Sequence, residues 1–366
     1  MRFFLKIAIF MVTLTIFNAA YSAEELTVDQ IIEGHIKAIG GIENIKELNN
    51  LVYSGGTYQE GDFTGNGNAS MSLARPYFKL VGNKNARDSY MEGYDGSAWE
   101  YYSSQGVVIR TVGPPSEAIR HYAGVEHPLV NYRAKGSKAE IVSEVQYEGS
   151  DVVVIKLTRM DGFEEFFYID QQNYQLKASS AVIPIHAFGE AISQITKISD
   201  YRNIGGVMIA HRFEAVQMPE GNVLSSMQWG KIEANTPLAE DWFSPPELDK
   251  KPAQQFAEKL YEQRSDINSV MWTYKNFRQS YPEINTNKMS NFAGFQMLKM
   301  GEIETSIALL EQNAQDYPDQ SDARFELGRA YLSADRNNDA RAQFNLALEF
   351  DPKNDQAKRE LENLNN

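Results

Sequence analysis

The last third of the chain repeats itself at a fixed interval of 34 residues. Gly294 recurs as Gly328, and Pro318 recurs as Pro352. A unit of this length holds two helices, and it buries its apolar face only by stacking on the next unit. The repeat therefore predicts an array of paired helices over residues 285–352.

The second copy carries small and aromatic residues in a defined order. Its key positions are Ala323, Leu327, Gly328, Tyr331, Ala340, Phe344, Ala347, Leu348, Asp351 and Pro352. This order resembles the tetratricopeptide repeat, in which small residues let two antiparallel helices pack closely and proline closes the unit. The resemblance implies a concave surface that binds a protein partner and has no chemistry of its own.

The pattern also predicts where the domains begin and end. We expect clear repeat units at 285–318 and 319–352, a degenerate helical pair at 253–282 and a polar capping helix at 355–364, which together form a helical domain of residues 253–366. Pro245-Pro246 cannot lie inside a helix or a central strand, so the boundary is placed there. A first domain then spans residues 23–248.

The first residues read as an export signal. Arg2 and Lys6 precede an apolar run, and Ala20 and Ser22 suit signal peptidase, which predicts a signal peptide of residues 1–22. The run is shorter than the roughly 20 apolar residues that cross a bilayer. No later segment is apolar enough to cross, so we predict a soluble periplasmic protein with no transmembrane segment in its mature form.

Composition excludes several classes of function. The chain has no cysteine, which rules out disulfides, cysteine nucleophiles and an N-terminal cysteine-linked lipid anchor. Its formal net charge is −14, and loss of Arg2 and Lys6 with the leader would make it −16. Such a field repels a polyanion, so no nucleic-acid partner is expected.

Between residues 26 and 234 the pattern changes from helical to extended. Leu26–Leu48 has helical spacing broken at Gly40-Gly41, which predicts two short amphipathic helices. Pro114–Val130 predicts a helical insertion, and Gly205-Gly206 and Glu220–Asn222 predict hairpin turns. The predicted strands are Val52–Tyr58, Ala69–Leu73, Tyr77–Val81, Ala98–Tyr102, Gly106–Thr111, Glu140–Tyr147, Asp151–Arg159, Phe163–Ile169, Leu176–Ile185, Ala191–Tyr201, Val207–Glu214 and Val223–Ala234. Such regular spacing predicts one large antiparallel sheet or an open barrel.

Several short sequence motifs in this region follow one another in an order that resembles a known family. They are a glycine-rich turn at Gly65–Gly67, Arg75-Pro76, Asp95-Gly96 followed by Trp99, Phe166–Asp170 and Trp242–Pro246. Together they resemble the outer-membrane lipoprotein carrier (Lol-type) superfamily over about residues 24–248. The resemblance implies an α+β fold, an antiparallel half-open β-barrel with a helical lid, whose concave face receives acyl chains. The all-α repeat domain follows it.

The resemblance also nominates site residues. In these carriers the arginine of the Arg-Pro pair contacts the lid backbone and helps to govern opening, and Arg75 occupies that position; an arginine that only satisfies surface carbonyls is the alternative. The aromatic residues that could line a ligand cavity are Tyr77, Phe78, Tyr94, Trp99, Tyr101, Phe167 and Trp229. The same side chains also suit a filled sheet core, because aromatic residues favour strands generally.

Catalytic and metal-binding motifs do not stand out. His121 and His127, with Glu126, could be drawn as a metal site, but their spacing is not that of a zinc-binding helix. Glu164 and Glu165 are neighbours on a predicted strand, so their side chains point to opposite faces. We therefore expect no catalytic residue, no metal and no cofactor.

Three functions remain open. The leading one is a non-enzymatic exported binding protein that holds a lipid or lipoprotein acyl chain in the half-barrel and a protein partner on the repeats. The second is an envelope scaffold whose β domain has a filled core and binds no lipid. The third and weakest is a hydrolase with scattered carboxylates or His121 and His127 as its site.

Overall fold

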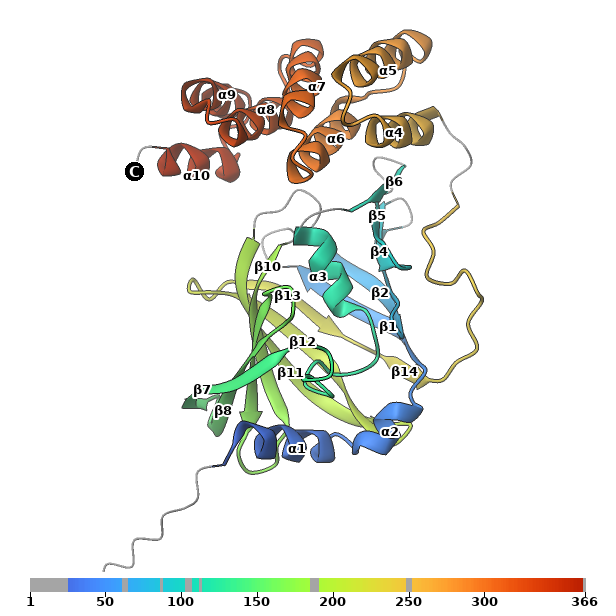
Figure 1. The fold of residues 1–366 in the computed structure, drawn as a ribbon, viewed down its shortest axis with the longest axis vertical. Coiled ribbons are helices and arrows are strands. Elements are labelled where there is room, and N and C mark those ends of the chain that lie inside the picture. Colours follow the sequence, from blue (N-terminus) through green and yellow to red (C-terminus); the bar gives the residue numbers. More distant parts are fainter. Residues whose placement is uncertain are drawn as a thin grey trace, which may run out of the picture.

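A computed structural model describes residues 26–60, 65–85, 88–102, 107–111, 114–184, 191–247 and 252–364. The chain forms a large curved sheet with helices on its concave side, followed by a layer of paired helices (Figure 1). The predicted leader, residues 1–22, lies outside the described residues. None of the described helices is both long and apolar enough to span a bilayer.

Among the described residues the sheet has 14 strands, and neighbouring strands are antiparallel. The strands are β1 Asn50–Glu60, β2 Gly65–Ala74, β3 Phe78–Asn85, β4 Asp88–Tyr94, β5 Ala98–Tyr102, β6 Val107–Arg110, β7 Lys138–Tyr147, β8 Ser150–Thr158, β9 Glu164–Asp170, β10 Leu176–Pro184, β11 Ala191–Ile204, β12 Val207–Gln217, β13 Val223–Gln228 and β14 Lys231–Ala234. Their order is β6-β5-β4-β3-β2-β1-β13-β12-β11-β10-β9-β8-β7, with β14 also on β1. Because the order ends at β6 and β7, the sheet is open, as predicted.

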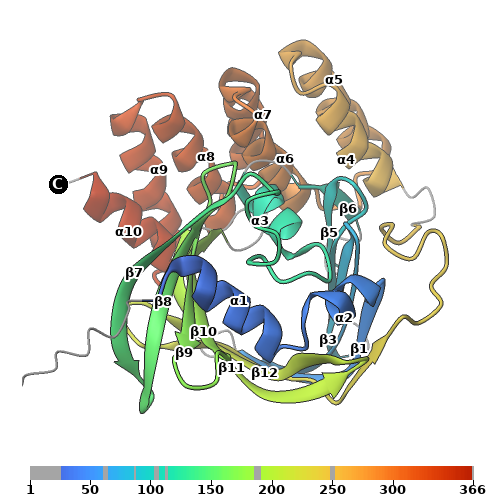
Figure 2. The ribbon, with the colours of Figure 1, turned by 60° about the horizontal axis from the view of Figure 1, so that its bottom comes forward.

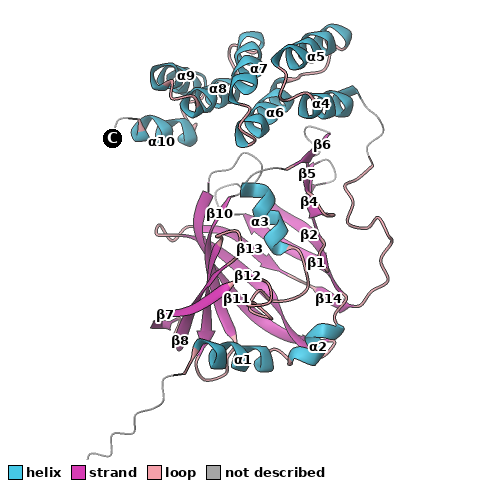
Figure 3. Ribbon diagram, viewed as in Figure 1, coloured by secondary structure: helices cyan, strands magenta, loops and turns pink. Residues whose placement is uncertain are grey.

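Three helices lie within the curve of the sheet (Figures 2 and 3). They are α1 Val28–Ala38, α2 Ile42–Glu47 and α3 Pro114–Tyr122. Thr27 begins α1 with a capping box to Gln30, and Gly40 and Gly41 separate α1 from α2 with positive φ angles of 120° and 84°. The two helices predicted at the start of the chain are therefore present.

Apolar clusters join these helices to the sheet. Ile39, Ile45 and Leu48 of the α1–α2 region pack with residues of β1, β12 and β14, while Ile31 and Ile32 of α1 pack on β8 and β9. Around α3, Ile119 meets residues of β3 and β5. The apolar residues lie on one face of each helix and on one face of the strands. These two apolar faces pack against each other and are buried.

The remaining helices pair along the chain after the linker. They are α4 Pro252–Glu262, α5 Ile267–Ser280, α6 Asn287–Lys299, α7 Ile303–Asp316, α8 Ser321–Ser333, α9 Asn337–Phe350 and α10 Asp355–Asn363. A Cβ on Gly294 of α6 would lie 2.6 Å from Leu310 Cγ, and one on Gly328 of α8 would lie 2.5 Å from Phe344 Cε1. The repeated glycine therefore seats a large side chain of the following helix.

The structure corrects three details of the sequence interpretation. Gly65–Gly67 is not a turn but the start of β2, where a Cβ on Gly67 would lie 2.4 Å from Tyr58 Cζ. The predicted strand Val223–Ala234 is divided at Trp229-Gly230 into β13 and β14. Strand β4 was not predicted, because its polar sequence DSYMEGY lacks a clear apolar alternation.

Candidate functional site

Arg75 connects the sheet to the lid formed by α1 and α2. Its guanidinium donates to the carbonyl oxygen of Ile45 at 2.9 Å and to that of Lys46 at 3.3 Å. Glu126 lies 3.5 Å away as an ion partner. The Arg75 side chain is 38% exposed, so water can compete for these bonds. Arg75 therefore joins the end of β2 to the backbone of α2, and its role in lid opening stays a prediction.

The predicted aromatic residues divide between several places. Phe78 and Tyr94 are opposite each other on β3 and β4 and pack with the cluster beneath α3. Phe167 is buried beneath α1, and Trp229 packs edge-on to Tyr53 at 5.2 Å between ring centroids. These four belong to the packed inner side of the domain.

The other predicted aromatics belong to the outer side and the linker. Trp99 is fully buried, but its Nε1 donates to the carbonyl oxygen of Phe243 in the linker at 3.0 Å. Tyr77 stacks on the Phe243 ring at 5.4 Å. Tyr101 lies two residues beyond Trp99 on β5, so it shares the outer face. These three side chains hold the linker or face outward rather than line the space beneath the lid.

Polar side chains interrupt the inner face near α3. Glu92 of β4 and Glu100 of β5 are directly paired across the two strands, in line with Met71 and Leu80 of the apolar cluster. Burial raises the pKa of Glu92 to about 7. A hydrogen bond from Tyr90 lowers this pKa in part, whereas the negative charge of the nearby Glu100 raises it further. This part of the concave surface is therefore less suited to an acyl chain than the part beneath α1 and α2.

The two histidines considered as a metal site have different surroundings. His127 packs on the rings of His35 and Phe167, and burial lowers its pKa well below the usual value. His121 contacts Asp161 through Nε2 at 2.7 Å and stacks on Phe163. The described contacts do not join them into one site.

A cluster of possible metal ligands does occur around His121. Atoms of Glu117, His121 and Asp161 all lie within 4.8 Å of one another. However, the guanidinium of Arg120 contacts both carboxylates. Because this cation already occupies both carboxylates, a divalent metal would have to displace it, and the cluster is better explained as an ion-pair network.

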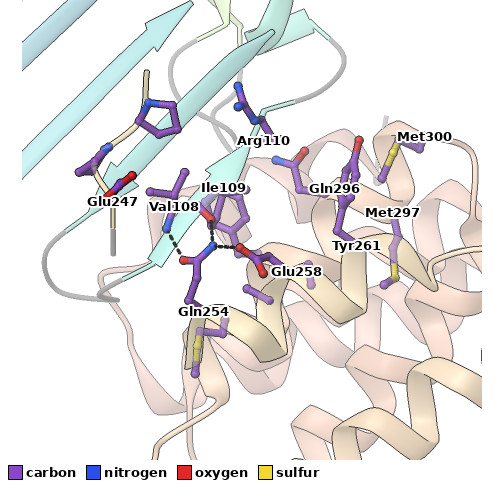
Figure 4. Close-up of a pocket in the computed structure, with 16 residues that line it drawn as sticks. Val108, Ile109, Arg110, Glu247, Gln254, Glu258, Tyr261, Gln296, Met297 and Met300 are labelled. Carbon is purple, nitrogen blue, oxygen red and sulfur yellow. Dashed lines mark hydrogen bonds between the residues drawn. The ribbon is translucent and has the colours of Figure 1, made fainter. Parts of the chain in front are cut away.

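A second candidate site lies where the sheet meets the repeats, and it was not anticipated from the sequence. A cavity of about 350 Å³ separates β6 and the linker from α4 and α6 (Figure 4). Its lining is Val108, Ile109, Arg110, Pro245, Pro246, Glu247, Gln254, Ala257, Glu258, Tyr261, Met289, Phe292, Ala293, Gln296, Met297 and Met300. The volume is within the range of small-molecule sites, and the lining is mostly apolar.

Gln254 closes one side of this cavity by bonding to the edge of the sheet. Its Oε1 accepts from the backbone N–H of Val108 at 2.8 Å, and its Nε2 donates to the carbonyl oxygen of Val108 at 3.3 Å. Nε2 also donates to Glu258 at 2.9 Å. One carboxamide on α4 thus satisfies both edge-facing backbone groups of Val108, as an additional strand would.

Comparisons with known proteins give separate matches for the helical repeats and for the sheet region. Residues 297–362 match the family model for the tetratricopeptide repeat. The helices that begin near the end of α6 and run to α10 are therefore tetratricopeptide-like, as the sequence predicted. A comparison with curated proteins finds no match.

The sheet region is similar to solved structures at low identity. A putative outer membrane lipoprotein-sorting protein domain from Vibrio parahaemolyticus is 10% identical, with a TM-score of 0.42, and the alignment covers 59% of this chain and 95% of that one. A DUF1329 family protein from Desulfovibrio piger is 10% identical, with a TM-score of 0.42 and coverages of 61% and 99%. A LolA superfamily protein from Nitrosomonas europaea is 13% identical, with a TM-score of 0.34 and coverages of 60% and 98%. Both resemblances that the sequence motifs indicated recur in these comparisons.

Proposed function

We propose that this chain is a non-enzymatic binding protein of the periplasm that takes up a lipid or acyl chain beneath its lid and binds a protein partner through its repeats. The observation that carries the proposal is the Arg75 latch, in which a half-exposed guanidinium ties α2 to the sheet through two carbonyl oxygens. Hydrogen bonds of this kind hold the lid closed, but water can replace them, so the lid can also open.

The surface beneath the lid has the right chemistry for an apolar ligand. Ile39, Ile45 and Leu48 of the lid region are buried against the sheet. When the lid moves away, the sheet side of this contact loses its apolar cover, and an acyl chain can replace the lid side chains. Each methylene so buried contributes about 0.8 kcal/mol, which offsets the cost of opening.

Substitution of Arg75 tests the latch directly. We expect Arg75→Leu to remove about 1–2 kcal/mol from lid closure, because hydrogen bonds from a charged donor are lost, which raises the open population about 5- to 30-fold. Native mass spectrometry of the mature chain purified from a periplasm, with organic extraction, measures ligand loading. Hydrogen exchange in α2 measures opening.

Two control variants make the result specific. Arg202→Leu removes a half-exposed arginine whose partner is Asp200 and should leave loading unchanged. Glu126→Gln removes the ion pairs of Glu126 with Arg75 and with Lys135 while the carbonyl bonds of Arg75 remain, and should have a small effect. Unchanged loading and unchanged exchange in a folded Arg75→Leu variant would contradict the latch.

One observation favours the scaffold function as the second candidate. Apolar clusters already fill the described contacts between α1, α2, α3 and the sheet. A wild-type chain that carries no extractable lipid, and ignores added fatty acid and lipoprotein, would support a filled β domain with a structural role. The repeats would then carry the binding of the protein partner, without a lipid beneath the lid.

A further inference from the structure

The cavity at the joint is built from two regular helix faces and one edge strand. Two sets of lining residues recur at spacings of three and four, so each set forms one continuous stripe. One set is Gln254, Ala257, Glu258 and Tyr261 of α4, and the other runs from Met289 of α6 to Met300 at the C-terminal cap of that helix. Figure 4 shows Tyr261, Met297 and Met300 on these helices across from Ile109 of β6. The walls therefore come from both domains, and a molecule inside would touch both.

The methionines of the cavity are not demanded by the repeat. Met289 and Met300 correspond, 34 residues later, to Ala323 and Ala334, so the second unit forms the same helix pair without them. Methionine is unbranched and polarisable and adapts to irregular apolar shapes, which suits a surface that changes its partner. Met289 and Met297 also pack in the buried core formed by α4 to α7. Met300, which is partly exposed, is therefore the methionine most available to a molecule in the cavity.

Gln254 and the charged groups at the edge of the cavity already have partners or are negative. Arg110 is held by Asp95 at 2.7 and 3.1 Å, and the carboxamide of Gln254 is used by Val108 and Glu258. Glu247 and Glu258 are exposed carboxylates among the lining residues. Among the described lining residues, a ligand would therefore contact an apolar wall and no unpaired cation. A carboxylate head group would lie near the negative charges of Glu247 and Glu258.

We propose that the joint cavity binds one unbranched alkyl chain carried by an uncharged head group, at a site separate from the surface beneath the lid. The cavity volume of about 350 Å³ lies within the range of small-molecule sites. An unbranched alkyl chain suits its mostly apolar lining. Because both domains supply its walls, the bound chain also fixes the repeats to the sheet.

The test uses the mature full-length chain with its methionine methyl groups labelled with carbon-13. Monoacylglycerols of 8, 10, 12 and 14 carbons are added below their critical micelle concentrations, and the methyl resonances are followed by NMR. We expect saturable shifts of Met297 and Met300, with affinity rising about three- to four-fold per methylene until the chain fills the cavity and then levelling off. Absence of saturable shifts, or affinity independent of chain length, would overturn the proposal.

Variants locate the ligand. Ala257→Phe places a ring in the cavity and should weaken binding at least ten-fold, while Ala342→Phe, on the exposed face of α9, should not change it. Met300→Gln keeps the length of the side chain but makes it polar and should weaken binding at least five-fold, so the test does not depend on one variant that may fold poorly. Equal binding by wild type, Ala257→Phe and Met300→Gln would overturn the assignment.

Two further comparisons test the head group and the independence of the site. Dodecanoate should bind about two- to five-fold more weakly than its glycerol ester, the size expected for exposed like charges; tighter binding of the acid would overturn the uncharged head group. Arg75→Leu should leave the Met297 and Met300 shifts intact. Their loss would show that the signal depends on the lid, and would overturn a separate site even if the proposed lid function stands.

Discussion

The surface beneath the lid and the joint between the domains are both lined with apolar side chains, but the side chains pack differently. Beneath the lid, Ile31, Leu48 and Ile155 are at most 1% exposed, and most contacts are made by branched residues. At the joint, methionine, proline and Gln254 surround about 350 Å³ of space. The comparison teaches that close packing holds the β domain together, whereas the contact between domains keeps room for a ligand.

The largest effect should come from the closely packed surface. Leu48→Ala removes a buried side chain from the cluster between the lid region and the sheet, and we expect a loss of about 3 kcal/mol in the free energy of unfolding, within the usual 2–5 kcal/mol. Urea unfolding of the mature chain measures it. A loss below about 1 kcal/mol would mean that the lid contact is as loosely packed as the joint.

The next effect concerns the polar part of the concave face. Burial raises the pKa of Glu92 from 4.5 to about 7, with Tyr90 opposing and Glu100 adding to the rise. The folded chain therefore keeps a proton that the unfolded chain has already released. The contribution of Glu92 to stability is thus present below about pH 4.5 and is lost as pH rises to about 7, amounting to at most about 3 kcal/mol.

Comparison with Glu92→Gln isolates this contribution from other titrating groups. The wild type should lose stability relative to the variant between pH 5 and pH 8 in urea unfolding experiments. Parallel pH profiles for the two proteins would show that Glu92 titrates normally and that this part of the concave face is open to water.

A smaller effect is expected at the joint itself. Gln254→Ala removes both hydrogen bonds to Val108, and because water can replace them at the edge of the sheet, the loss in unfolding free energy should be about 1 kcal/mol. Lys259→Ala, an exposed change on the same helix, serves as the control. If Gln254→Ala costs as much as Leu48→Ala, the joint is a structural core rather than an adaptable contact.

The smallest effect on stability should follow from Met300→Ala. Truncation of a methionine in a close-packed core lowers the free energy of unfolding by about 2–5 kcal/mol. Met300 is partly exposed and faces the cavity. We therefore expect a loss in the free energy of unfolding of less than about 1 kcal/mol, measured by thermal or urea unfolding. The same substitution should weaken alkyl-chain binding at the joint. A large stability loss with no change in binding would reverse the distinction between the two surfaces.

Local patterns predicted most of the elements but not how they face each other. The lid helices and most strands follow from the spacing of apolar residues. The 34-residue repeat placed Gly294 and Gly328 at equivalent positions of two helix pairs, but the side chains that they contact came from the structure. Trp99 was grouped with the inner aromatics, yet it faces the linker, because a strand's alternation says which residues share a face and not which face is concave. The domain boundaries and the roles of the site residues stay predictions.

The sequence by itself determined the helical array, the antiparallel sheet and the apolar face of the lid, because each depends on periodicity among near neighbours in the chain. Only the tertiary structure showed that the carbonyl oxygen of Ile45, 30 residues earlier, is the lid group that Arg75 reaches. It alone brought Val108 to Gln254, 146 residues later. Those contacts depend on how far the sheet curves and where the linker returns. Both are set by packing over the whole molecule, and for that reason the joint cavity left no pattern that could be recognised in advance.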